Sequence, residues 1–505
     1  MTDAPHFRIG TRGSDLALWQ AHHVHDLIAA SGGTADITIL STQGDREQVQ
    51  AFEKLEGKGF FTKEIEQALI EDRIDLAVHS HKDLETRQPE GLCIAAVPAR
   101  ASAHDVLLVH HRALGAGPWL QLAEGARVGT SSVRRRDQLL MLRPDLRIEA
   151  LRGNVPTRLK KLTDGAYDAI VLAGAGLERL NLNLTGVHVQ PLDPRWFVPA
   201  PAQGALALQM RESDPRRTWL GRLTDVAAAS AIDEERSVLR ALEGGCQLPF
   251  GAYHAGGESP LRCFLQKESG PTYTVASSAA RALTELEVDH PRHILITRVP
   301  RPTDLLHRLA QGHGHTIVEW PAAIPTAIES ADAPTVEMDW VWLGSPGAAR
   351  MAEGWLQDHP AVRIAIPGNG TADALQEADR HRLGYCGSGQ PLNAWSSFAE
   401  ERMAGEHIAI PHGTRSLRRW EQTETLATLH PWAQYEVVAN PEQVPHADVV
   451  CFTSPSNVHL WKGDAPAVCL AIGATTSAAL DDRGWDHVAA HHPDAFGILE
   501  ALQQG

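Results

Sequence analysis

The chain has 505 residues, of which 43% are hydrophobic and 21% charged, and its formal net charge is −16. This length suffices for about three or four domains with cores of their own, and the composition excludes disordered, collagen-like and coiled-coil proteins. The acidic balance argues against a nucleic-acid or anionic-membrane partner over the whole surface, but it is compatible with a local basic cleft. With neither a signal-peptide pattern nor an apolar run of membrane length, a soluble cytoplasmic protein is expected.

Short strand-like runs alternate with amphipathic helical stretches in the first part of the chain, which predicts α/β layers. The first strand is expected at residues 7 to 11, followed by a helix that Ser14 caps. A helix over residues 63 to 71 precedes a buried strand at residues 74 to 78. That strand ends in a polar cluster, His-Ser-His-Lys-Asp, at residues 79 to 83. Because ligands of open α/β sheets collect at the carboxyl ends of strands, this cluster is a candidate site.

The segment from residue 127 to residue 161 is strongly basic in this acidic chain. It holds ten Lys and Arg residues against three Asp and Glu residues, a net charge of +7. Several of the arginines lie in predicted strand-to-helix turns, at residues 129 to 135 and 151 to 158. Helix N-terminal N–H groups and planar guanidinium groups both favour anions. The pattern favours an anion-binding cleft over a merely solvated basic helix face.

The six cysteines are far apart and form no Cys-x-x-Cys pair, so neither a zinc site nor a disulfide framework is indicated. Four of them lie in apolar strand-like runs and are expected to be core thiols, namely Cys93, Cys263, Cys451 and Cys469. Cys246 is different, because it follows two glycines in a loop. An exposed thiol there suits a covalent attachment or a nucleophile, whereas a partly buried structural thiol is the alternative.

Seven short motifs follow one another over about 250 residues: Arg12-Gly13-Ser14, Gly57 to Glu64, His79 to Asp83, Gly129 to Arg135, Leu151 to Asn154, Pro201 to Ala205, and Gly244-Gly245-Cys246. Their order and spacing resemble the porphobilinogen deaminase family, also called hydroxymethylbilane synthase. The resemblance implies a three-domain α/β protein. Two domains, residues 1–100 with 196–222 and residues 101–195, would be like a type II periplasmic binding protein with a hinged cleft. A small α+β third domain, residues 223–288, would carry the cysteine.

The resemblance also implies the chemistry. The family builds hydroxymethylbilane from four porphobilinogen units, with release of ammonia, on a dipyrromethane cofactor that a thioether joins to the loop cysteine. Asp83 matches the catalytic carboxylate, which can stabilise the cation left after ammonia departs and can move protons. The residues matched to cofactor binding are Cys246, Lys82, Asp83, Arg134 and Arg135. Those matched to substrate binding are Arg12, Ser14, Arg152, Arg158, Arg179 and Lys58, and no metal is implied.

The turn around the catalytic aspartate departs from the family pattern. The family commonly has Met, Val and Pro where this chain has His81, Leu84 and Glu85. A different shape of the turn after Asp83 is therefore expected.

A second part of the chain begins near residue 290. Residues 1–290 carry a net charge of −5 and residues 291–505 carry −11, and a single lysine follows Lys267. The second part contains an internal duplication: residues 341–346 and 367–375 recur at 450–455 and 472–480. Each copy predicts strand, polar turn, helix, strand, Gly-bearing turn and helix. Two such α/β lobes would face each other across a cleft.

The two-lobed pattern is similar to uroporphyrinogen III synthase, which implies that residues 291–505 close hydroxymethylbilane into uroporphyrinogen III without metal or cofactor. Candidate substrate contacts are Ser454, Ser456, Asn457, Thr475 and Thr476, and helix capping is the alternative for each of them. A Val-Tyr-x-Thr string of that family appears here as Val-Val-Ala-Asn at residues 437–440. Either Tyr435 takes the place of that tyrosine or this domain is altered.

The main hypothesis from the sequence is thus a bifunctional enzyme of tetrapyrrole synthesis. A monomer is expected that binds small molecules, namely porphobilinogen and a linear tetrapyrrole, and neither nucleic acid nor membrane. Two alternatives stay open. One is a deaminase whose C-terminal half is catalytically degenerate, and the other is a non-catalytic anion-binding protein with the same hinged architecture.

Overall fold

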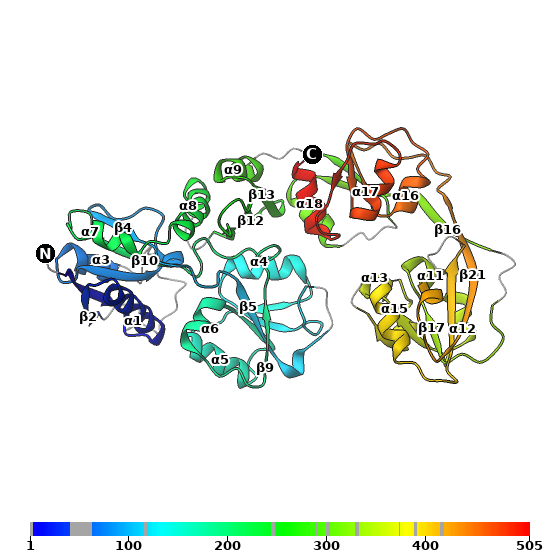
Figure 1. Cartoon of the computed structure of the whole chain (residues 1–505), viewed down its shortest axis with the longest axis horizontal. Coiled ribbons are helices and arrows are strands. Elements are labelled where there is room, and N and C mark those ends of the chain that lie inside the picture. Colours follow the sequence, from blue (N-terminus) through cyan, green and yellow to red (C-terminus); the bar gives the residue numbers. More distant parts are fainter. Residues whose placement is uncertain are drawn as a thin grey trace. The chain divides into compact units, whose positions relative to one another are not determined.

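A computed structural model describes residues 4–40, 63–115, 119–243, 248–287, 291–298, 304–328, 333–372, 374–387, 391–414 and 419–504 (Figure 1). The chain forms two compact units. Unit 1 comprises Met1–Arg292, Pro302–Thr316 and Asp494–Gly505, and unit 2 comprises His293–Arg301 and Ile317–Pro493. No helix in the described part of the chain is long and apolar enough to cross a membrane.

The first sheet of unit 1 has five strands, in the order β2 (Thr34–Ile39), β1 (His6–Thr11), β3 (Leu76–Ser80), β10 (Leu206–Arg211) and β4 (Leu92–Ala96). β1 is parallel to β2 and β3, whereas β10 is antiparallel to β3 and β4. Its helices are α1 (Asp15–Ala30), α3 (Lys63–Ile70) and α7 (Arg217–Leu220), with short 3-10 turns η2 (His81–Asp83) and η4 (Gly221–Leu223). Ser14 caps α1 as predicted, since its hydroxyl accepts from the N–H of Ala17.

The second sheet repeats this plan, in the order β7 (Arg147–Glu149), β6 (Arg127–Gly129), β8 (Ala169–Ala173), β5 (Asp105–His110) and β9 (Val187–Pro191). β6 is parallel to β7 and β8, and β5 runs antiparallel to β8 and β9. The helices are α4 (Val133–Leu142), α5 (Val155–Thr163) and α6 (Gly174–Leu180), with the 3-10 turn η3 (His111–Ala113). The chain crosses between the two sheets twice, after β4 and after β9, so the predicted α/β layers are confirmed.

A third, antiparallel sheet consists of β11 (Phe250–Tyr253), β12 (Leu261–Lys267) and β13 (Gly270–Ala276). Helices α8 (Val226–Ala241) and α9 (Ala279–Glu287) bury one face of it, where Phe250, Cys263 and Val238 share a hydrophobic core. Two helices from much later in the sequence also belong to unit 1, namely α10 (Leu305–Gly312) and α18 (Ala495–Gln504).

Unit 2 holds two further sheets. One has the order β15 (Thr316–Glu319), β14 (His293–Ile296), β22 (Val449–Phe452), β23 (Cys469–Ala471) and β24 (Val488–Ala489), with helices α16 (Pro455–His459) and α17 (Ala474–Asp481). The other has the order β16 (Ala323–Ala327), β21 (Thr428–Ala439), β20 (His407–Gly413), β17 (Trp340–Trp342), β18 (Arg363–Ile366) and β19 (Leu383–Cys386). Its helical segments are α11 (Pro346–Met351), α12 (Glu353–Asp358), α13 (Asn369–Ala372), α14 (Glu377–Arg380), α15 (Pro391–Glu400) and η5 (Arg419–Gln422).

The internal duplication is visible in these elements, because each copy contains strand, helix, strand and helix in the predicted order. The predicted core thiols are confirmed for Cys263, Cys451 and Cys469, which are buried in strands, while Cys93 is half-buried. Burial raises the pKa of Cys451 to about 12 and that of Cys469 to about 11. Neither of these two thiols is suited to act as a nucleophile.

Candidate active-site cleft

A pocket of about 120 Å³ lies between the first and second sheets of unit 1. The first sheet and its turns contribute Ser80, Lys82 and Gly204, and the second contributes Arg135, Arg158 and Arg179. Among the described residues that line the pocket, four are cationic and none is a carboxylate. An enclosed set of cations of this kind favours a ligand with several negative charges.

Lys82 and Asp83 lie on η2, at the carboxyl end of β3 where the sequence predicted a site. The Lys82 ammonium donates to Oε1 of Gln203 at 3.1 Å. Burial lowers the pKa of Lys82 to about 8, although the charge of Asp83 raises it. Asp83 itself is exposed on the same turn. Lys82 lines the pocket, whereas Asp83, the accessible carboxylate next to it on the turn, is not among the described residues that line it.

Arg134 and Arg135, in the first turn of α4, share one buried carboxylate. Nη2 of Arg134 lies 2.8 Å from Oδ2 of Asp105, and Nη2 of Arg135 lies 2.6 Å from Oδ1 of the same residue. Burial alone would raise the pKa of Asp105, but the two guanidinium groups outweigh it and hold that pKa well below its usual range. Oδ1 of Asp105 also accepts from Nε2 of Gln203 at 3.0 Å, which connects the arginines to Lys82.

This network changes the expectation for Arg134. Its guanidinium also donates to the main-chain oxygen of Val198 at 2.7 Å, and Arg134 does not line the pocket, whereas Arg135 does. Asp105 is not among the predicted site residues, although a signal existed: it is a carboxylate directly before the apolar run of β5. Gln203 is not among them either, although it lies in the Pro201 to Ala205 motif.

The other arginines of the cleft are positioned by main-chain carbonyls. Nη2 of Arg179 donates to the oxygen of Gly204 at 2.7 Å, and Nε of Arg158 donates to the oxygen of Gly153 at 2.7 Å. Burial lowers the pKa of both arginines. Within the described residues, Nε of Arg179 is buried and has no hydrogen-bond partner. An anionic oxygen in the pocket would satisfy it.

Arg12, Ser14 and Arg152, which were also predicted as ligands, do not line the pocket. Arg12 and Ser14 follow β1, and because β1 is parallel to β3, they lie at the same sheet edge as Lys82. Arg152 is exposed in the turn before α5. Cys246 and Lys58, to which the resemblance gives the cofactor thioether and a substrate contact, lie outside the described residues.

The basic segment contributes fewer cations to the cleft than its net charge of +7 suggests. Besides Arg134 and Arg135, which pair with Asp105, four more of its ten basic side chains form ion pairs with carboxylates, and none of these four lines the pocket. The pairs are Arg127 with Asp168, Arg136 with Asp137, Arg143 with Asp145, and Lys160 with Asp164. The segment supplies Arg135 and Arg158 to the pocket itself.

Helix α8 contributes to the shape of the turn that carries Asp83. Arg236 of α8 donates to the main-chain oxygens of His81 at 3.1 Å and Glu85 at 2.6 Å, on both sides of Asp83. His81 is buried, and in the described part of the chain its Nδ1 has no hydrogen-bond partner. Burial, followed by the charge of Arg236, lowers the pKa of His81 to about 3. The imidazole in this turn is therefore neutral.

The candidate contacts of unit 2 divide by environment. Ser454 caps α16, where its hydroxyl accepts from the N–H of Asn457, and Asn457 donates to the oxygen of Thr297 at 2.7 Å. Thr476 is buried, while Ser456 and Thr475 are exposed. The capping alternative that the sequence left open therefore describes Ser454. The hydroxyl of Tyr435 lies 3.4 Å from Oγ of Ser345, the equivalent cap in the other lobe.

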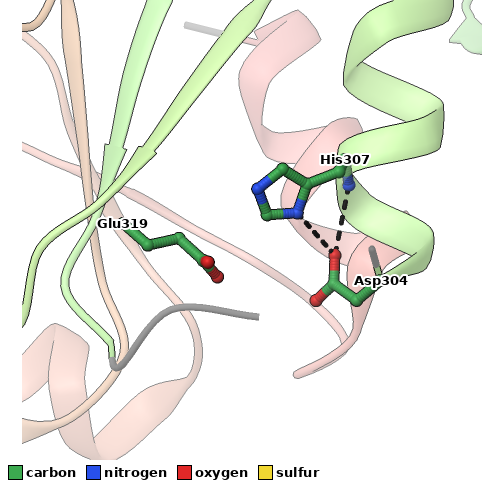
Figure 2. A group of neighbouring side chains, drawn as sticks. All are labelled: Asp304, His307 and Glu319. Atoms are coloured by element: carbon green, nitrogen blue, oxygen red, sulfur yellow. Dashed lines mark hydrogen bonds and ion pairs between the residues drawn. The ribbon is translucent and has the colours of Figure 1, made fainter. Parts of the chain in front are cut away.

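Asp304, His307 and Glu319 carry donor atoms that metals favour, and each already has a partner in the fold. Figure 2 shows Asp304 at the start of α10, where Oδ1 accepts from the N–H of His307 and lies 3.0 Å from its Nδ1. Glu319 pairs with Arg298 at 2.5 Å. Helix capping and ion pairing account for these side chains without a metal.

Comparisons with known proteins identify a family for the first part of the chain. Residues 7–218 match the family model described as porphobilinogen deaminase, dipyromethane cofactor binding domain. Among curated relatives, the porphobilinogen deaminase of Nitratidesulfovibrio vulgaris strain DP4 is 47% identical over 253 residues, which is 49% of this chain and 78% of the relative. That of Brevibacillus brevis is 44% identical over 257 residues, 50% of this chain and 81% of the relative.

Solved structures give weaker matches. Uroporphyrinogen-III synthetase from Helicobacter pylori is 13% identical with a TM-score of 0.31, over 42% of this chain and 100% of that one. An ancestral cationic amino acid solute binding protein is 14% identical with a TM-score of 0.29, over 43% of this chain and 87% of that one.

Proposed function

The chain belongs to the porphobilinogen deaminase family, and we propose that unit 1 joins four porphobilinogen units head to tail into hydroxymethylbilane with release of ammonia. The pocket with four cationic side chains carries this proposal. Each pyrrole of the substrate bears an acetate and a propionate, so the growing product is a polyanion. A site without these cations could not hold it through successive additions.

The cofactor of this family is dipyrromethane, and the residues of the cleft fit it. Its carboxylates match the cationic lining and the buried Nε of Arg179, which has no hydrogen-bond partner among the residues that the structure describes. We assign its thioether to Cys246, and its carboxylates to Lys82 and Arg135, with Asp83 facing the pyrrole N–H groups and Arg134 helping to position Arg135 through Asp105. When bound, it supplies the free pyrrole carbon from which the chain grows.

The side chains around it divide the work of substrate binding and proton transfer. Arg158, Arg179 and Ser14 orient the substrate carboxylates, and Arg12, Arg152 and Lys58 are the further substrate contacts that the family resemblance implies. Asp83 accepts from the pyrrole N–H of the substrate and stabilises its positive charge as the C–N bond breaks and ammonia leaves. When the new C–C bond forms, Asp83 takes up the proton that the attacking pyrrole carbon loses.

For unit 2 we propose the next reaction, closure of hydroxymethylbilane into uroporphyrinogen III with inversion of the last pyrrole and loss of water. Two features support this proposal. Unit 2 has duplicated strand–helix lobes, and it follows, in the same chain, a deaminase portion whose product is the required substrate. Exposed Ser456 and the main-chain N–H groups near Ser454 and Thr476 are the candidate propionate contacts.

Two measurements on the purified full-length protein test these proposals. The intact peptide that contains Cys246 should carry the added mass of dipyrromethane, and an unmodified peptide would overturn the deaminase assignment. Incubation with porphobilinogen should yield uroporphyrinogen III. Exclusive formation of uroporphyrinogen I, which arises by spontaneous closure, would show instead that unit 2 is a degenerate domain.

A further inference from the structure

The third sheet of unit 1, as described, ends in β13, so one edge of this strand faces no other strand. Alternate residues of an antiparallel strand turn their N–H and C=O groups to opposite edges. The N–H and C=O groups of Tyr273 and Val275 point away from β12. If these groups had no partner, they would cost stability and would invite pairing with another chain.

Side chains from the end of the sequence satisfy this edge. Oε1 of Gln503, on α18, accepts from the N–H of Val275 at 3.0 Å, while its Nε2 donates to the oxygen of Tyr273 at 2.9 Å. Nε2 of His313, at the end of α10, lies 2.8 Å from the same oxygen. One glutamine thus makes the two hydrogen bonds that a neighbouring strand would make.

Helix α18 is anchored by buried polar and aromatic contacts. Glu500 is only 5% exposed, and its Oε1 accepts from Nη1 of Arg262 on β12 at 2.7 Å. Phe496 is fully buried and packs edge-on against the ring of Tyr273, with 4.9 Å between centroids. Asp494 pairs with Arg195, in the segment between β9 and β10, at 2.9 Å. The helix therefore contacts both the third sheet and a crossing segment of the cleft.

Helix α10 packs so closely on β13 that only glycine fits at its end. A Cβ atom at Gly312 would lie 1.9 Å from the main-chain oxygen of Pro271. The hydroxyl of Thr272 donates to the oxygen of Gly312 at 3.1 Å. On another side of α10, Nε of Arg308 donates to the main-chain oxygen of Met141 at 3.0 Å. Met141 lies near the end of α4, the helix that carries Arg134 and Arg135.

We propose that α10 and α18 are the intramolecular partner of the third domain and hold it in unit 1, so the deaminase portion of this chain is not separable at residue 290. The second part of the sequence supplies structural elements of the first. This inference goes beyond the proposed activities, and its test needs neither of them.

Hydrogen exchange of the full-length protein tests the edge directly. In Gln503→Leu, which keeps the size of the side chain but removes both hydrogen bonds to the main chain of β13, peptides covering residues 270–276 should exchange about five- to tenfold faster. Peptides covering β1 and β3 should not change. Gln376→Leu, at an exposed position without a cap bond, is the matched control and should leave residues 270–276 protected.

A second pair of variants tests α10. Gly312→Ala should lower the thermal midpoint of unit 1 and speed exchange of residues 270–276, whereas Gly354→Ala, in a helix with open space at that position, should do neither. A chain ending at Pro493 should lose the same protection, and if it does not fold, the two point variants decide. Unchanged protection of residues 270–276 in both Gln503→Leu and Gly312→Ala would overturn the proposal.

Discussion

At the residue scale, the cleft is organised around a buried carboxylate that is not itself a ligand. Asp105 is fully buried and pairs with both Arg134 and Arg135. Gln203 bonds Asp105 through its amide nitrogen and Lys82 through its amide oxygen. Cations crowded into one cleft repel each other, and this shared carboxylate offsets part of that repulsion. The spare N–H groups of Arg135 and the ammonium of Lys82 are thereby held in place for an anionic ligand.

Asp83 should be dispensable for folding and essential for turnover. Because its side chain is exposed, Asp83→Ala should change the free energy of unfolding by less than about 0.5 kcal/mol. Loss of the carboxylate that stabilises the substrate cation should lower kcat by about 100-fold or more. Fixed-time assays with porphobilinogen measure the turnover, and Asp164→Ala, at the exposed residue that follows α5, is the control. Near-normal turnover of Asp83→Ala would contradict its assigned role.

His81 should make the protein sensitive to acid. The pKa of His81 is about 3 in the folded protein, whereas that of an exposed histidine is about 6.5. Between these two pH values the unfolded chain binds a proton at this residue that the folded chain does not bind. Stability should therefore fall as the pH drops from 6.5 towards 3. At pH 5 this histidine should account for about 2 kcal/mol of the loss.

The variant His81→Met, which restores the residue common in the family, should remove that contribution. Urea unfolding at pH 7 and pH 5 should show a smaller loss of stability for the variant than for the parent protein. His79, whose pKa burial lowers to about 4, remains in both proteins and contributes equally. An identical pH dependence in the two proteins would be evidence against a neutral buried His81.

At the element scale, the crossing segment before β10 has an unusual main chain that places Gln203. Ala202 is left-handed, with φ of 61°, and its N–H donates to Oε2 of the buried Glu235 at 2.7 Å. Gly204 follows with φ of 85°, and its oxygen receives the hydrogen bond from Arg179. The left-handed residues on both sides of Gln203 thus direct its side chain to Lys82 and the carbonyl of Gly204 to Arg179.

Gly204→Ala should damage this turn beyond the ordinary cost of a left-handed alanine. An added Cβ would lie 2.5 Å from the main-chain oxygen of Ala101 and 2.6 Å from that of Ser102. We expect a loss of about 2–4 kcal/mol in stability and a higher KM, because the carbonyl that positions Arg179 would shift. Gly91→Ala is the control: φ is similar, 81°, but nothing lies within 4 Å of its Cβ. It should cost about 1 kcal/mol and leave KM unchanged. Equal effects would show that the close approach does not matter.

At the scale of the whole molecule, charge and structure are distributed differently along the sequence. Residues 291–505 carry most of the net negative charge, −11 of −16, yet α10 and α18 from this part belong to unit 1. Compositional boundaries therefore do not coincide with the boundaries of the compact units. Thermal unfolding should still resolve one transition for each unit.

Asp105→Asn should affect one of these transitions and not the other. The substitution keeps the shape of the side chain but leaves two buried guanidinium groups without their carboxylate, which should cost about 3–5 kcal/mol. Calorimetry at pH 7 should show a lower midpoint for unit 1 and an unchanged midpoint for unit 2. Asp448→Asn, at an exposed site of unit 2, is the control and should leave the midpoint of unit 1 unchanged. A joint shift of both transitions would mean that the units unfold together.

The sequence by itself determined what depends on local pattern. Periodicity and capping residues predicted the α/β layers, the helix that Ser14 starts and the repeated elements of the second part, because strands and helix ends are specified by residues close in sequence. Ordered motifs also placed Lys82 and Asp83 at the end of a strand.

The tertiary structure alone decided what depends on distant residues. The carboxylate of Asp105 engages Arg134 about thirty positions later, and Gln503 bonds a strand more than two hundred positions earlier. No local pattern encodes such pairs, because they form only when packing brings the segments together and removes water from between them. That is why the sequence predicted a cationic cleft, and the fold decided which of its arginines face the pocket and which helices hold the third domain.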